Sequence, residues 1–86
     1  MITVKLKFFG IFSDYLGSEV FIKLDNESNL VFLRQYILSN LIVVDMNFLS
    51  DVLIRSVFSD GQIILDDNYI LKMNDVICLL PPFSGG

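Results

Sequence analysis

Apolar and polar residues alternate in two segments near the start of the chain. The alternation runs through residues 2–8 and returns in residues 19–24. A period of two is typical of a β-strand with one buried face, so both segments are predicted to be strands. Residues 10–16 between them predict one or two helical turns that end at Gly17, because glycine readily takes the left-handed conformation that follows a helix. We expect the two strands to pair as a wide hairpin.

The spacing of the apolar residues becomes helical after residue 28. The residues that follow this spacing are Leu30, Leu33, Ile37, Leu38 and Leu41. The polar segment 25–29 offers several N-cap residues, and Ser39 and Asn40 are suited to the other end, so we predict a helix over residues 29–40. Residues 42–51 carry no clear pattern.

Short strands and turns are predicted after residue 51. Residues 52–58 are rich in β-branched and aromatic residues and are predicted to form a strand. The Asp-Gly pair within residues 59–62 favours a tight hairpin turn, from which the chain returns through residues 63–65. Residues 66–68 have the composition of a second turn.

The last predicted strand, residues 76–80, is apolar at every position. It follows a turn in which Asn74 is suited to a positive φ. A fully apolar strand is typical of the centre of a sheet, either buried on both faces or covered by a helix. The order β-β-α-β-β-β therefore predicts an α+β fold, with one mixed sheet of four to five strands packed on one main helix. We place the final strand beside the first.

The composition limits the classes of function. The chain has 86 residues, of which 53% are hydrophobic, so we expect one domain with apolar surface left over for a partner. It has no His and one Cys, which argues against His-dependent catalysis, a His-ligated metal and an internal disulfide. A net charge of −4 disfavours nucleic acid as a partner. No targeting segment is evident, so we expect a cytoplasmic protein with no independent catalysis, no metal and no membrane contact.

The sequence ends in a pattern with a specific physical meaning. Pro81 and Pro82 lack an N–H and cannot extend a β-ladder, so the chain must leave the sheet there. Gly85 and Gly86 have no side chains, so they could thread a channel as narrow as bare backbone. We therefore predict a domain over residues 1–80 and a flexible tail over residues 81–86. A terminal glycine pair can also be idle slack.

The ending resembles that of the MoaD/ThiS family of ubiquitin-like sulfur carriers, and most closely the small subunit of molybdopterin synthase. In that subunit a polar turn and an apolar strand lead to Pro-Pro, two variable residues and Gly-Gly. The residues that carry the resemblance are Leu71–Gly86, with support from Val4–Gly10, Tyr15–Gly17 and Leu33–Tyr36. Asn74 and Phe83 depart from the family, which usually has Gly at the first position and often Val at the second.

The resemblance implies a β-grasp, ubiquitin-like fold and a chemical role for the last residue. An ATP-using enzyme of the ubiquitin-activating type would adenylate Gly86, and a sulfur donor would displace AMP to leave a thiocarboxylate. The large subunit of molybdopterin synthase would then accept the tail. ATP is used by the activating enzyme, and no cofactor is bound permanently. The residues expected to thread into the partner are Pro81, Pro82, Phe83, Ser84 and Gly85.

Three alternative functions share these features. The first is a ubiquitin-like protein modifier that is joined through Gly86 to lysines. The second is a sulfur carrier for thiamin thiazole synthesis, although the Pro-Pro step favours the molybdopterin branch. The third is an interaction module with an idle tail. A homodimer is possible for any of them when the partner is missing.

Other residues have competing interpretations. Phe9 and Phe21 fall on the outward side of their strands, where they are either core residues of a two-sided sheet or a docking surface for a partner. Cys78 lies among apolar residues, which predicts a buried and inert thiol. The carboxylates near the end of the chain are expected to serve turns rather than a metal site or an acid/base pair. These are Asp66, Asp67 and Asp75.

Overall fold

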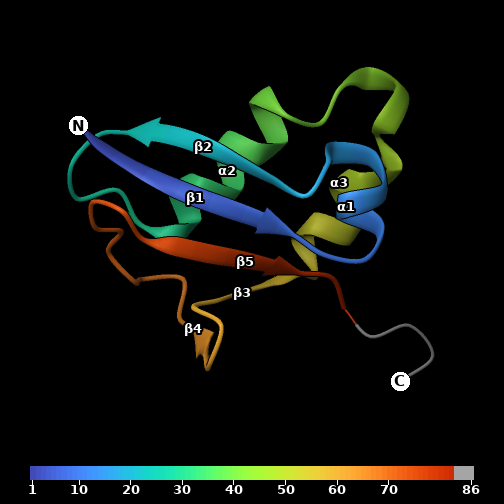
Figure 1. The fold of residues 1–86 in the computed structure, drawn as a ribbon. Coiled ribbons are helices and arrows are strands. Elements are labelled where there is room, and N and C mark those ends of the chain that lie inside the picture. Colours follow the sequence, from blue (N-terminus) through green and yellow to red (C-terminus); the bar gives the residue numbers. More distant parts are fainter. Residues whose placement is uncertain (83–86) are drawn as a thin grey trace.

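The computed structural model describes residues 1–82 and contains one five-stranded mixed sheet. Figure 1 shows the sheet with the strand order β2-β1-β5-β3-β4. Each of the first two segments predicted to be strands is a strand, and so is the last. The bounds are β1 Ile2–Phe8, β2 Glu19–Leu24, β3 Val57–Ser59, β4 Ile64–Leu65 and β5 Val76–Leu80.

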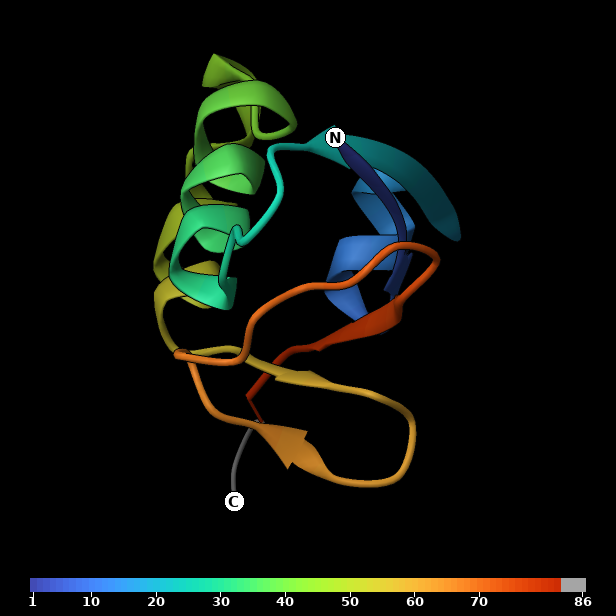
Figure 2. The same ribbon diagram turned by 90° about the vertical axis from the view of Figure 1, so that its left-hand side faces the viewer.

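Helices cover one face of this sheet. Figure 2 shows α2 and α3 together on one side, with the strands on the other. The predicted helix over residues 29–40 is confirmed as α2, in which the Asn29 side chain caps the N-terminus by accepting the Phe32 N–H at 3.0 Å. The helical turns predicted before Gly17 are confirmed as α1. The bounds are α1 Ile11–Leu16, α2 Leu30–Asn40, the 3₁₀ turn η1 Val44–Met46 and α3 Phe48–Ile54.

The strand pairing matches the expected arrangement. β1 and β2 form an antiparallel pair in which Val4 lies opposite Ile22. β5 lies beside β1 in parallel, with Leu6 opposite Ile77, and it pairs antiparallel with β3 on its other side. The final strand is therefore central and next to the first, as predicted. This is the β-grasp arrangement.

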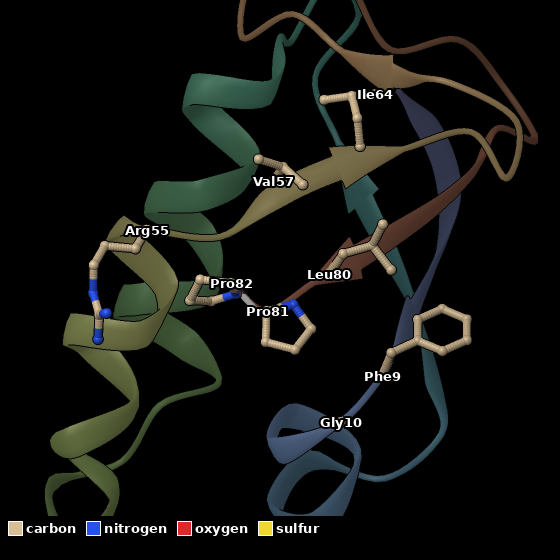
Figure 3. Close-up of a pocket in the computed structure, with 8 residues that line it drawn as sticks. All are labelled: Phe9, Gly10, Arg55, Val57, Ile64, Leu80, Pro81 and Pro82. Carbon is tan, nitrogen blue, oxygen red and sulfur yellow. The ribbon is translucent and has the colours of Figure 1, made fainter. Parts of the chain in front are cut away.

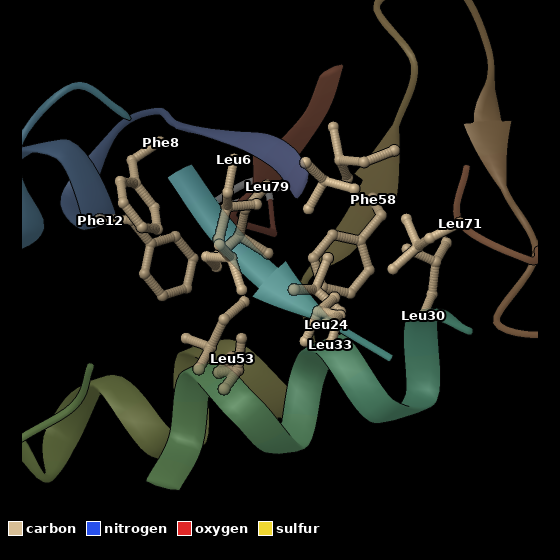
Figure 4. Close-up of a cluster of buried hydrophobic side chains, with 14 of the residues drawn as sticks. Leu6, Phe8, Phe12, Leu24, Leu30, Leu33, Leu53, Phe58, Leu71 and Leu79 are labelled. Carbon is tan, nitrogen blue, oxygen red and sulfur yellow. The ribbon is translucent and has the colours of Figure 1, made fainter. Parts of the chain in front are cut away.

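The core lies between the sheet and its helices. Every second residue of β1 points into it, and Figure 4 shows Leu6, Leu79 and Phe58 from three strands meeting side chains of α2 and α3. Phe12 of α1 closes the end of this core and is fully buried. The alternation read from the sequence therefore decides which face of each strand the helices cover.

The strand predicted over residues 52–58 is wrong in its first half. Val52, which begins it, lies within α3, and the strand starts only at Val57. The β-branched residues of this segment favour a strand locally, but tertiary packing overrides that preference. Leu49 and Leu53 are four residues apart and both buried, so they form the inner face of a helix. This spacing was the available signal for α3 in the segment without a clear pattern.

β5 is covered by helices on one face only. Its residues alternate in burial: Ile77 and Leu79 lie in the core, while Val76 is 43% exposed on the opposite face. Burial on both faces, one of the two expected alternatives, is therefore wrong. Cys78 is only half-buried and lies on the open face, so the prediction of a buried thiol is wrong as well.

Two turns formed as predicted. Asn74 has a φ of 69° in the turn before β5, the conformation expected of it. Asp60 begins the turn between β3 and β4, where its carboxylate accepts the N–H groups of Ile63 and Gln62. The hydrogen bond from the Ile63 N–H, followed by the one from the Gln62 N–H, holds the pKa of Asp60 below its usual value.

Among residues 1–82, no helix is long and apolar enough to span a membrane.

The Arg34 side chain ties α2 to the segment after α3. Its Nη1 donates to the carbonyl oxygens of Leu53 at 2.6 Å and Ser56 at 2.9 Å, and its Nη2 lies 3.3 Å from Asp67 Oδ1. The guanidinium also stands over the Phe58 ring, 4.9 Å from its centroid. A planar group with several fixed donors suits this role better than an ammonium.

Arg34→Ala is expected to lower the free energy of unfolding by about 1–3 kcal/mol, because it leaves part-buried carbonyls without a donor. Arg34→Lys should recover only part of this loss, since one ammonium cannot reproduce the forked contacts. Urea unfolding followed by circular dichroism measures the effect. The control is Arg55→Ala, whose Nε bonds only within its own helix segment, to Asp51 O at 3.3 Å. Equal losses in the two alanine variants would contradict the role of Arg34.

Candidate docking groove at the end of the last strand

An apolar groove of about 610 Å³ lies where β5 ends. Figure 3 shows side chains from the end of β1, from β3 and β4, and from the end of β5 around it. Arg55 is the charged residue of the lining. The full lining is Phe9, Gly10, Arg55, Val57, Ile64, Leu80, Pro81 and Pro82.

The groove is a consequence of the strand register. Val57 lies opposite Leu80 across the β3–β5 pair, so both side chains are on the same face of the sheet. Their neighbours Phe58 and Leu79 point into the core, so this face is the one without helices. Phe9 follows the buried Phe8 and is 42% exposed. Phe9, Val57 and Leu80 therefore form a partly exposed apolar surface at one end of the sheet.

The two prolines form the wall of the groove where the chain leaves β5. Both are half-buried, and neither has an N–H with which to continue the ladder. Gly10 packs against the first of them: a Cβ added there would lie 2.9 Å from the Pro81 Cγ. Gly10 also has a φ of 59°, which favours glycine. The start of the tail is therefore seated against the loop that follows β1.

The predicted tail residues divide at this point. Pro81 and Pro82 line the groove, as described above. The four remaining predicted site residues, Phe83, Ser84, Gly85 and Gly86, lie outside the described residues. Their threading into a partner and the chemistry at Gly86 stay predictions.

Phe9 and Phe21 are both on the surface, so the alternative that they form the core of a two-sided sheet is wrong. Phe9 lines the groove, and Phe21 is 65% exposed on the same open face. Phe21 belongs to a smaller hollow of about 230 Å³ that it shares with Lys5 and Val76. The two phenylalanines therefore lie in separate hollows, and their role in docking stays a prediction.

Sequence reasoning missed several groove residues. The signal for Leu80 and Val57 was present, because each lies next to a residue of the predicted core in a strand and must face the other way. Gly10 carried no comparable signal, since its role depends on a contact with Pro81 some 70 positions later. Arg55 was missed because residues 52–58 were predicted to be a strand, whereas Arg55 lies between α3 and β3.

The carboxylates near the end of the chain accept hydrogen bonds in turns, except that of Asp67, which forms the ion pair with Arg34 described above. Asp66 Oδ1 accepts the Asn68 N–H at 2.8 Å. Asp75 Oδ2 accepts the Tyr69 O–H at 2.8 Å and the Lys72 N–H at 2.9 Å. Burial of the Tyr69 hydroxyl raises its pKa, and the hydrogen bond that this hydroxyl donates to Asp75 is the second cause of the increase. Within residues 1–82 no group of three or more Cys, Asp or Glu is placed to hold a metal ion.

Solved structures provide the similarities to known proteins. No family model and no curated protein sequence matches this chain. A chain in a complex of subunits 1 and 2 of the molybdopterin-converting factor from Helicobacter pylori is 29% identical, with 99% of this chain and 100% of that one covered and a TM-score of 0.67. A putative molybdopterin converting factor subunit 1 from Pyrococcus furiosus is 19% identical over 96% of this chain and all of its own, with a TM-score of 0.73.

A third similar structure is SAMP1 from Haloferax volcanii. It is 17% identical, with 98% of this chain and 99% of that one covered and a TM-score of 0.63. These matches cover nearly all of this chain and nearly all of each matched chain, so they confirm the α+β, β-grasp architecture. Together with the Helicobacter pylori match, they also confirm the resemblance to ubiquitin-like proteins of the MoaD/ThiS family.

Proposed function

We propose that this chain is a sulfur carrier that delivers sulfur for molybdopterin synthesis from a thiocarboxylate on Gly86. The observation that carries the proposal is the 29% identity, across 99% of this chain, to a chain in a complex of subunits 1 and 2 of a molybdopterin-converting factor. The broader class, a ubiquitin-like sulfur carrier or modifier, is supported by all three similar structures.

The chemistry begins with activation of a poor electrophile. A C-terminal carboxylate has a pKa of about 3.5 and is ionised at neutral pH, so it resists attack by a nucleophile. In the first proposed reaction a carboxylate oxygen of Gly86 attacks the α-phosphorus of ATP, and pyrophosphate leaves. A sulfur nucleophile then attacks the carbonyl carbon, and the C–O bond to AMP breaks. The product is a thiocarboxylate, whose sulfur is available to an acceptor.

The groove gives the enzymes that perform these steps a surface to bind. Its lining is apolar apart from Arg55 and is partly exposed, which suits a protein interface. The neighbour from Helicobacter pylori is a complex of subunits 1 and 2. By extension we propose that a large subunit of molybdopterin synthase and an adenylating enzyme of the ubiquitin-activating type both dock at the groove and take the tail from there.

The test is to incubate the purified chain with its adenylating enzyme, ATP and sulfide, and then to read the intact mass. We expect a gain that equals the exchange of one oxygen for sulfur, located on Gly86 by fragmentation. The product should then convert a pterin precursor in the presence of the large subunit. An unchanged mass, while the enzyme activates another carrier in the same assay, contradicts the proposal.

The same experiment separates the alternatives. A protein modifier would be recovered in amide linkage between Gly86 and lysines of other proteins, which appear as larger conjugates on immunoblots. A carrier for thiamin synthesis would gain the sulfur but would fail to supply the molybdopterin large subunit. An interaction module would bind its partner equally well without Gly85 and Gly86, and would show no change in mass.

A further inference from the structure

The free edge of β2 is a second surface with features of an interface. β2 is at one end of the strand order, so within residues 1–82 only β1 pairs with it. Three of its residues, Glu19, Phe21 and Lys23, have exposed side chains on the open face, and Phe21 is 65% exposed. An unpaired strand with an exposed aromatic residue is a template for pairing with another strand.

The backbone groups on this edge can be assigned from the hydrogen bonds of β1. Phe8 N–H donates to Ser18 O at 2.9 Å, so the even-numbered residues of β2 face β1 in the alternating antiparallel pattern. Lys5 N–H donates to Asp75 O at 2.8 Å, on the other side of β1, which agrees with this alternation. The N–H and C=O groups of Glu19, Phe21 and Lys23 therefore point away from the sheet.

We propose that β2 pairs in antiparallel register with β2 of a second copy of this chain, with Phe21 opposite Phe21 of the second copy. In this register all three residues with outward-facing backbone groups form hydrogen-bonded pairs. Glu19 lies opposite Lys23 of the second copy, and Lys23 lies opposite Glu19 of the second copy. The dimer thus has two oppositely charged cross-strand pairs around a central aromatic pair, each of which favours pairing.

The charges select this register over its neighbours. A shift by two residues in one direction would place Glu19 opposite Asp25 of the second copy, and a shift in the other direction would leave both charged residues without a partner of opposite sign. Charged side chains on an edge strand usually prevent association. Here the two charged residues of the strand, Glu19 and Lys23, have opposite signs and lie symmetrically about Phe21, which makes the edge complementary to itself. Lys23 has no ion pair within residues 1–82, so its ammonium is available to the second copy. Glu19 Oε2 lies 3.5 Å from Lys5 Nζ of its own chain, so in the dimer its carboxylate would be shared between Lys5 and Lys23 of the second copy.

The proposed dimer does not use the groove. β2 is at the opposite end of the sheet from β3 and β4, whose side chains line the groove. Pairing at β2 would therefore leave Pro81 and Pro82 of both copies open to a partner. The inference is independent of the sulfur-carrier proposal, and either can fail without the other.

The register is tested by disulfide trapping in a Cys78→Ser background. Directly opposed residues of a hydrogen-bonded antiparallel pair have Cα atoms about 5.5 Å apart, within the range that a disulfide spans. Phe21→Cys should therefore form a covalent dimer under mild oxidation. The matched control is Lys23→Cys, which faces Glu19 of the second copy and should therefore form no disulfide-linked dimer. Equal trapping of both variants, or of neither, overturns the proposed register.

The charge pairs are tested by sedimentation over a wide range of concentration. The wild-type chain should dimerise reversibly. Lys23→Glu should weaken the dimer about tenfold, because it places like charges opposite each other twice. The double variant Glu19→Lys with Lys23→Glu should restore it. Lys72→Glu changes the net charge equally away from β2 and should have no effect. A wild-type chain that is monomeric throughout, including one that pairs only with a strand of another protein, overturns the proposal.

Discussion

Deletion of Gly86, or replacement of Gly85 by Val, is expected to abolish adenylation of the chain while leaving its fold unchanged. The proposed reaction takes place at the carboxylate of Gly86, and deletion moves the terminal carboxylate back by one residue. A valine at position 85 would put a branched side chain into the backbone-wide channel that we expect the tail to enter in the adenylating enzyme. Loss of position or orientation at the reacting atoms costs orders of magnitude in rate. ATP–pyrophosphate exchange by the adenylating enzyme measures the loss.

The fold should be unaffected because the core is elsewhere. The buried apolar cluster of residues 1–82 extends from Ile2 to Leu79 and includes neither Pro81 nor Pro82. Circular dichroism and thermal unfolding should therefore match the wild-type chain. Ser84→Ala is the matched control, since it preserves the chain length and both glycines, and it should retain exchange activity. Normal exchange with either glycine variant would show that the tail is not the activated group.

The fold was predictable because local patterns and tertiary packing agree over most of the chain. The alternation in residues 2–8 and 19–24 survives as β1 and β2, since each strand buries one face against helices. Agreement fails at residues 52–58, where strand-forming residues lie in α3 and the buried pair Leu49 and Leu53 decides the outcome. A short helix whose inner face has two residues leaves little periodicity in a sequence.

The docking site was predictable only in part. Pro81 and Pro82 mark their own position, because two residues without an N–H must end a ladder wherever they occur. The groove beside them depends on which strands are neighbours, and so on contacts between distant parts of the chain. The groove can be recognised only once the strand order is known, because that order places Val57 of β3 and Phe9 after β1 on either side of Leu80. Pattern alone identifies the exit of the tail but not the surface around it.

Gly10→Val is expected to lower both the stability of the chain and its activation by the adenylating enzyme. The added Cβ would lie 2.9 Å from the Pro81 Cγ, and a φ of 59° strains a branched side chain. Backbone strain and overpacking of a proline ring that cannot change rotamer together predict a loss of about 2–4 kcal/mol in the free energy of unfolding. Relief of the clash requires Pro81 to move, which changes the direction in which the tail leaves the groove.

Gly17→Val separates the two effects. Gly17 has a φ of 89°, so valine is strained there as well, but apart from its two chain neighbours no residue of the described part, 1–82, has an atom within 4 Å of the added Cβ. Both variants should unfold at lower urea concentration than the wild type. At a temperature where both remain folded, only Gly10→Val should lose activation, by about tenfold or more, since a small displacement of a reacting group costs that much. Equal exchange rates for the two variants would show that the contact between Gly10 and Pro81 does not direct the tail.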